Sequence, residues 1–189
     1  MGWALKAAAT HCNHGMGYFL YGIELSSTPL LFGKLDEDYH LETPGTLEIL
    51  IKSWKEAKGS AFLVRHEVFV NEQGVPVELE LDELDASAIH ALAYRNGECV
   101  GTARFILLGD GQAQIGRMAV LAQFRGQGIG KQILIKLMAL AKSKGISSLI
   151  LHSQVAVMPF YEKLGFEAQG PNYEEAGIAH RNMILMLPK

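Results

Sequence analysis

The chain has 189 residues, a formal net charge of −3 and 49% hydrophobic residues, which fits one globular domain with room for an appendage. The slight negative charge gives no support to nucleic-acid binding, and no apolar run reaches membrane-spanning length. The two cysteines, Cys12 and Cys99, are too few for a disulfide framework, so we expect a cytoplasmic location.

Residues 1–45 mix small, polar and aromatic residues without a sustained period and end in the turn-like ETPGT (Glu42–Thr46). We therefore expect an N-terminal appendage of unknown role over residues 1–45 and a folded domain over residues 46–189. The HCNH stretch (His11–His14) has no second ligand pair at zinc spacing, so we predict surface residues and no metal site.

The first expected elements are a strand and a helix. Residues 47–52 alternate in polarity, which is typical of a strand. From Trp54 to about Val70 the apolar residues recur on one helical face, and NEQGVP (Asn71–Pro76) ends the helix. The acidic run Glu78–Asp85 follows as a loop, which either attracts a cationic amine or is simply solvated.

Three antiparallel strands are expected next. The segments His90–Arg95 and Cys99–Leu107 flank Asn96-Gly97, the preferred pair for a tight hairpin turn. A third strand is expected over about Ala113–Val120.

The C-terminal part of the sequence alternates helices with strands. An apolar stripe predicts a helix from about Gly128 to Gly145, and a short buried strand follows over Ser147–Leu151. A short helix over Met158–Phe166 and a final strand over Arg181–Leu187 complete a mixed α/β single domain.

The stretch RGQGIGKQ (Arg125–Gln132) lies between a strand and a helix. It fails the P-loop template, because Arg125 replaces the first glycine and Gln132 replaces the Ser/Thr; its glycine spacing also fails the dinucleotide fingerprint. A helix N-terminus behind flexible glycines still favours an anion such as a pyrophosphate. The alternative interpretation is a tight turn with ordinary glycines.

Four motifs in order give the chain a family resemblance. Arg125-x-x-Gly128-x-Gly130 resembles the R/Q-x-x-G-x-G/A signature of the GNAT superfamily of N-acetyltransferases, with IGRMAV upstream and FYEKLGF (Phe160–Phe166) downstream. RHEVFVNEQ (Arg65–Gln73) and YEEAGIAHRNM (Tyr173–Met183) resemble the ElaA-like subgroup, although Ala179 stands where that subgroup has proline. The resemblance runs from Leu47 to the C-terminus and leaves residues 1–45 unmatched.

This resemblance implies an α/β domain whose mixed, mostly antiparallel sheet is flanked by helices and splayed at an acetyl-CoA site. The enzyme would move acetyl directly to an amine of a small molecule or peptide. The backbone of Met118, Ala119 and Val120 would pair with the pantetheine arm, and one of those amides would polarise the thioester. The CoA pyrophosphate would lie against Arg125, Gly126, Gln127, Gly128, Ile129, Gly130 and Lys131; Lys131 either helps with the phosphates or is solvated.

The catalytic candidates follow from the same resemblance. Tyr161 is expected to protonate the CoA thiolate, the alternative being a helix tyrosine with its hydroxyl in solvent. A base must take a proton from the amine, and four candidates stay open, namely Glu72, His90, His152 and His180. A cysteine nucleophile is not expected, since neither cysteine has an activating partner. The alternative function is a non-catalytic acyl-CoA-binding module; no nucleic-acid or membrane partner is expected, and a homodimer stays open.

Overall fold

The sheet follows from the alternating segments expected above. The computed structural model describes residues 45–188, which form a seven-stranded sheet in the order β1-β2-β3-β4-β5-β7-β6. Neighbouring strands are antiparallel except β4 and β5, which are parallel. The strands are β1 (Leu47–Ser53), β2 (Ile89–Arg95), β3 (Glu98–Gly109), β4 (Gln112–Val120), β5 (Ser148–Gln154), β6 (Glu167–Glu175) and β7 (Ile178–Met186).

Two long helices and several short ones flank this sheet. α1 starts at a capping pair, because the Ser53 amide donates to the Glu56 carboxylate at 3.2 Å, and α3 is followed by Gly145 in the left-handed conformation. The helical segments are α1 (Trp54–Arg65), the π-helical η1 (His66–Glu72), α2 (Val77–Glu80), the 3₁₀ turns η2 (Glu83–Ala86), η3 (Ala122–Phe124) and η4 (Val155–Val157), α3 (Ile129–Ser143), and α4 (Met158–Glu162).

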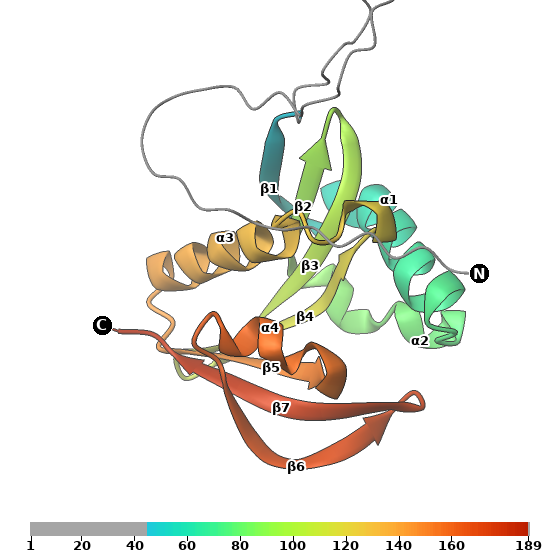
Figure 1. Ribbon diagram of the computed structural model, residues 1–189. Helices are drawn as coiled ribbons and strands as arrows, with labels where there is room; N and C mark the ends of the chain where they lie inside the picture. Colours follow the sequence, from blue (N-terminus) through green and yellow to red (C-terminus); the bar gives the residue numbers. More distant parts are fainter. Residues whose placement is uncertain (1–44, 189) are drawn as a thin grey trace, which may run out of the picture. The chain divides into compact units, whose positions relative to one another are not determined.

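The core lies on both faces of the sheet because successive strand residues point to opposite sides. On one face, Ala91 and Phe105 belong to a buried cluster with Ile133 of α3. On the other face, Leu92 packs with Ala57 of α1. Figure 1 shows α1 and α3 on either side of β1–β4, with α4 beside β5. This arrangement confirms the mixed, mostly antiparallel α/β sheet expected from the sequence.

The sheet opens between β4 and β5. Their pairing runs from Gln112↔Ser148 only to Ile115↔Leu151, so the last residues of both strands have no partner across this boundary. A bulge bends β4 here: its register against β3 steps from Gly116 to Ala119, and Arg117 has φ +48. The bulge therefore produces the splay that the resemblance implied.

Three segments differ from expectation. The acidic run is not a loop but contains α2 and η2, with Glu80 and Asp85 buried. β6 was missed because its residues are mostly polar and exposed. β7 begins at Ile178 instead of Arg181, directly after a two-residue turn at Ala176-Gly177 whose φ angles are both positive.

The appendage at residues 1–45 and the HCNH stretch fall outside the described residues, apart from Gly45. Within residues 45–188, no helix is long and apolar enough to cross a membrane. That same range holds no cluster of three His, Cys, Asp or Glu side chains suited to a metal ion.

Candidate active site

A cleft of about 1300 Å³ includes the open side of β4 and β5. Gly126, Gly128 and Lys131 line it in the glycine loop, and Ala176 and Ile178 line it at the β6–β7 turn. The splay of the sheet thus joins the predicted anion loop to a second region built by segments far apart in the sequence.

The glycine loop presents free backbone amides to this cleft. Gly126 and Gly128 have φ +76 and +78, a conformation that glycine adopts without strain. The first intrahelical bond of α3 runs from the Gln132 amide to the Gly128 carbonyl at 3.0 Å, and no side chain caps the helix. The amides of Ile129, Gly130 and Lys131 therefore lack helix partners and carry the partial positive charge of a helix N-terminus.

Two side chains of this loop are already engaged with other parts of the protein. Gln127 accepts a hydrogen bond from Arg95 and is not among the lining residues. The Ile129 side chain is buried in the core beneath α3. Gln127 and Ile129 can therefore contribute to a ligand only through the backbone.

Arg125 is held by Glu72 at the end of η1. Its Nη1 and Nη2 donate to the two carboxylate oxygens at 2.6 Å each, and its Nε donates to the Val120 carbonyl at 2.9 Å. The hydrogen bonds from Arg125 lower the pKa of Glu72. A carboxylate so paired is a weak base at neutral pH, so the geometry weighs against Glu72 as the proton acceptor.

Along β4, successive peptide groups face β3 and the splay in turn, which leaves a free edge on the side of the splay. The Leu121 amide donates to the Val100 carbonyl of β3 at 3.0 Å, so the peptide groups of Leu121 and Ala119 face β3. Those of Val120 and Met118 alternate with them and face the splay. Of the three backbone positions that the resemblance named, Met118 and the Val120 amide are available to a ligand, whereas the Val120 carbonyl already accepts from Arg125 and Ala119 faces β3.

Tyr161 lies at this edge from the α4 side. Its ring is nearly buried, packs edge-on against Phe160 and Phe166, and its hydroxyl lies 3.5 Å from the Met118 sulfur. Burial raises the pKa of Tyr161 to about 12. The phenol is therefore protonated at neutral pH and directed at β4, not at bulk solvent.

His90 lies elsewhere. Its side chain is fully buried, its ring lies tilted against the Trp54 ring with the centroids 4.7 Å apart, and Nε2 lies 3.1 Å from the Asp85 carbonyl. His90 is absent from the cleft lining, and burial lowers its pKa. Because an amine bound in the cleft does not contact His90, we no longer consider His90 a candidate base.

His90 borders a buried ionic cluster that the sequence reasoning missed. Arg65 donates to Glu80 and Asp85, and Arg104 donates to Asp85 at 3.0 Å and to Asp82 at 2.6 Å. Burial alone would raise the pKa of Asp85, but the hydrogen bonds and charges of the two arginines lower it to about 2.

Arg117 completes this ionic cluster at the bulge of β4. It donates to the carbonyls of Leu79 and Glu80 and, at 3.1 Å, to Asp82. The cluster thereby fixes α2 and η2 against the sheet beside Met118. The acidic residues of this run are interspersed with leucines, and nothing in that pattern distinguishes the buried carboxylates from solvated ones.

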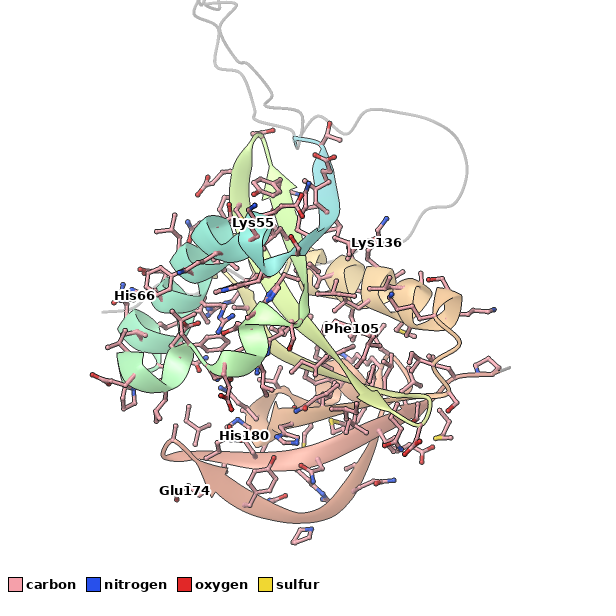
Figure 2. The ribbon with its side chains drawn as sticks, turned by 180° about the vertical axis from the view of Figure 1, so that it is seen from behind. Lys55, His66, Phe105, Lys136, Glu174 and His180 are labelled. Atoms are coloured by element: carbon pink, nitrogen blue, oxygen red, sulfur yellow. The ribbon has the colours of Figure 1, made fainter. Side chains whose placement is uncertain are left out.

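His152 and His180 share the sheet face opposite Tyr161. Leu151 and Met183 belong to the cluster that contains Tyr161, so His152 on β5 and His180 on β7 point to the other side. Both line the cleft. Figure 2 labels His180, which belongs to β7.

These two histidines have different partners. His180 Nδ1 lies 2.8 Å from the Ile178 carbonyl, which can only accept, so Nδ1 carries a hydrogen and Nε2 is free to accept a proton. His152 Nδ1 lies 3.9 Å from Glu175, and the Tyr173 ring lies 6.1 Å from each imidazole. The cleft therefore has a buried phenol on one side of the splay and two imidazoles on the other.

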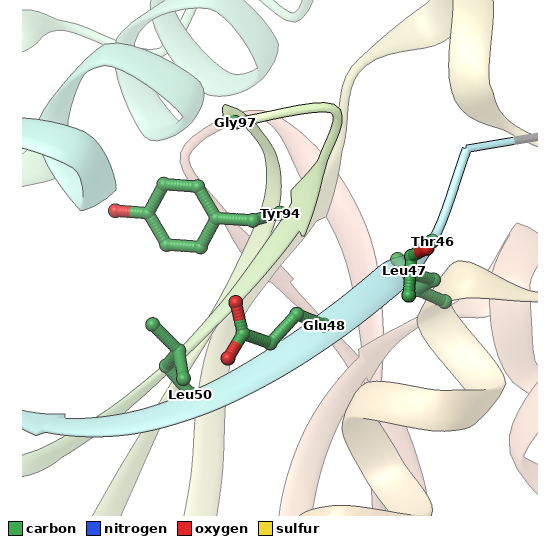
Figure 3. Close-up of a pocket in the computed structure, with 6 residues that line it drawn as sticks. All are labelled: Thr46, Leu47, Glu48, Leu50, Tyr94 and Gly97. Atoms are coloured by element: carbon green, nitrogen blue, oxygen red, sulfur yellow. The ribbon is translucent and has the colours of Figure 1, made fainter.

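A second, smaller pocket of about 410 Å³ lies at the β1 edge. Figure 3 shows its lining, Thr46, Leu47, Glu48, Leu50, Tyr94 and Gly97. It combines one exposed carboxylate with mostly apolar contacts and holds none of the predicted site residues. The larger cleft is therefore the candidate active site.

Residues 50–187 match the family model described as an acetyltransferase (GNAT) domain. The chain is 36% identical over 139 residues to the uncharacterized N-acetyltransferase YjcF of Bacillus subtilis, covering 73% of this chain and 99% of that protein. Escherichia coli ElaA has a similar structure, with 27% identity, a TM-score of 0.66 and coverage of 74% of this chain and 99% of ElaA.

The name of a third similar protein includes the acyl donor, acyl-CoA. An acyl-CoA N-acyltransferase from Pseudomonas aeruginosa has a TM-score of 0.68 and 28% identity over 74% of this chain and 99% of its own. The family match and these relatives favour an enzyme over a non-catalytic module. The chain belongs to the GNAT family of acetyltransferases and is an N-acetyltransferase.

Proposed function

We propose that the protein transfers acetyl from acetyl-CoA directly to a primary amine of a small molecule or peptide. The observation that carries the proposal is the splay between β4 and β5, which joins a glycine-loop anion site to a cleft with a phenol and imidazoles. The donor and acceptor can meet in such a gap without a covalent enzyme intermediate.

The residues present fit acetyl-CoA. The free amides of Ile129, Gly130 and Lys131 suit the pyrophosphate, because a helix N-terminus and its unpaired N–H groups attract anions. The Val120 amide and the peptide groups of Met118 would pair with the pantetheine arm as an added strand. An amide that points into the gap would then polarise the thioester carbonyl.

Tyr161 is the proposed acid. As the new C–N bond forms and the C–S bond breaks, the departing thiolate takes the phenolic proton, which the amine's released proton later replaces. Burial raises its pKa to about 12, so at neutral pH the phenol is protonated and the donor form is present.

His180 is the proposed base, with His152 as the second candidate. A protonated amine cannot attack, and the His180 Nε2 lone pair is left free by the bond from Nδ1 to Ile178. The two imidazoles and Tyr161 lie on opposite sides of the splay, which suits amine entry from one face and thiolate departure toward the other.

The test combines binding with turnover. Calorimetry should detect acetyl-CoA binding, and a thiol reagent should report CoA released in proportion to added amine. His180→Gln should lower kcat about 100-fold while leaving the acetyl-CoA Kd unchanged. If His152→Gln has that effect instead, His152 is the base; no acetyl-CoA binding by the wild-type protein contradicts the proposal as a whole.

The wider setting stays a prediction. A cytoplasmic location rests on the cysteine content alone. A homodimer remains an expectation that light scattering of the purified protein would decide.

A further inference from the structure

One part of the cleft is lined by apolar side chains that have no role in the proposed function so far. Here the acceptor region means the lining contributed by Val75, Leu79 and Leu84 of the η1–η2 segment and by Ala176 and Ile178 at the β6–β7 turn. It lies on the sheet face of His152 and His180.

Apolar side chains dominate the acceptor region. Leu79 is 56% exposed and Leu84 is 45% exposed, although aliphatic side chains of this size are usually buried. They come from one short segment that the ionic cluster fixes in place, and they face the cleft together. Exposed aliphatics that line a rigid cleft are typical of a site for an apolar ligand group.

The charged residues beside this region are already neutralised. The three arginines 65, 104 and 117 are paired with the three carboxylates of Glu80, Asp82 and Asp85, so the cluster carries no net charge. Arg125, nearer the glycine loop, is held by Glu72. Each arginine that lines the cleft is thus already paired with a carboxylate, so its charge is compensated before an acidic acceptor enters.

Little negative charge is left for a polycation. Among the described residues that line the cleft, Glu175 is the acidic side chain outside these pairs, and it is half exposed beside His152. One half-exposed carboxylate can attract one ammonium group but not the several charges of a polyamine or aminoglycoside.

We infer that the acceptor is an apolar primary monoamine, such as an arylalkylamine, whose hydrocarbon body packs on Val75, Leu79 and Leu84. This inference rests on the proposed function and adds the substrate class to it. The amine nitrogen lies toward the splay and the imidazoles, while the body stays against the aliphatic wall. A second charge placed against this wall would be desolvated without a partner, so charged analogues are disfavoured there.

Three amines test this inference in the wild-type protein with acetyl-CoA. 2-Phenylethylamine is the apolar monoamine, phenylalanine adds a carboxylate to the same body, and spermidine adds further amines. We expect kcat/KM for 2-phenylethylamine to exceed both others by at least about tenfold, because the acceptor region itself has no charged side chain to pair with a carboxylate or a second ammonium group.

Matched leucine variants locate the contact. Leu79→Asn and Leu84→Asn should each lower kcat/KM for 2-phenylethylamine about tenfold, mainly through KM, with an unchanged acetyl-CoA Kd. Leu63→Asn is the control, since Leu63 is 70% exposed on α1 and does not line the cleft. It should leave all constants unchanged.

The outcomes separate the two proposals. Faster turnover of spermidine or phenylalanine overturns the substrate class and leaves the acetyltransferase proposal standing. Equal loss of 2-phenylethylamine activity in the Leu63 control and the cleft variants also overturns the inference. Absence of acetyl-CoA binding in the wild-type protein overturns the proposed function itself.

Discussion

Arg65→Met tests whether the buried ionic cluster fixes the segment that forms the cleft wall. Arg65 is fully buried, donates to Glu80 and Asp85, and lies over the Trp54 ring at 5.7 Å. Methionine keeps much of the volume but leaves two buried carboxylates short of a cation. Removing one partner of such a pair destabilises a protein by about 3–5 kcal/mol.

This loss is a large part of the domain's total free energy of unfolding. Domains of this kind have a free energy of unfolding of about 5–15 kcal/mol, and at this size each kcal/mol lost lowers Tm by about 2–4 °C. We therefore expect Tm to fall by about 6–20 °C, with a matching decrease in the urea midpoint followed by circular dichroism. Lys52→Met is the matched control, because it breaks the exposed Lys52–Glu56 pair, and exposed pairs contribute little.

The pH dependence adds a second readout. The folded pKa of Asp85 is about 2 against an ordinary 3.8, so its stabilisation, about 2 kcal/mol, is complete above pH 3.8 and is lost as pH falls through 2. In Arg65→Met this acid-sensitive part should shrink, and Arg65→Met combined with Asp85→Asn should cost less than the sum of the two single changes. A loss below about 1 kcal/mol in Arg65→Met, or strict additivity, would show that Arg65 does not hold the cluster together.

Three further predictions address the loop, the base and the thiol. Gly128→Ala forces alanine to φ +78, which costs about 1–2 kcal/mol of conformational energy, and should raise the acetyl-CoA Kd at least tenfold by calorimetry. Gly130→Ala should change neither the stability nor the Kd, since its Cβ would lie 3.5 Å from Met118 and Phe160, an ordinary contact distance. Glu72→Gln should reduce kcat less than about fivefold at neutral pH, whereas a loss near 100-fold would restore Glu72 as the base. Burial raises the pKa of Cys99 to about 11, so in a Cys12→Ser background the folded protein should react with a disulfide reagent at pH 8 far more slowly than the urea-unfolded protein; equal rates would contradict the burial.

Strong local patterns made much of the fold predictable. The Asn96-Gly97 hairpin, the apolar stripe of α3 and the glycines before it were read from residues a few positions apart. β6 was missed because neither of its faces is consistently buried, so its polar residues show no alternation.

The candidate site was harder to predict because it depends on contacts between distant residues. Tyr161 and the glycine loop followed from motifs, but the burial of Glu80 depends on Arg65, fifteen positions earlier in the chain. The weakness of Glu72 as a base likewise depends on Arg125, 53 positions away. Sequence patterns give the residue types, whereas pairing across the fold decides which of them are free to react.

Tyr161→Phe tests whether the buried phenol protonates the departing thiolate, with Tyr173→Phe as the matched control from the other side of the splay. Amine-dependent CoA release and the acetyl-CoA Kd are measured on the same preparations of wild-type and variant protein. We expect Tyr161→Phe to lower kcat about 100-fold with an unchanged Kd, because only the proton donated to the thiolate is lost. Unchanged kcat in Tyr161→Phe, at full acetyl-CoA binding, would contradict it.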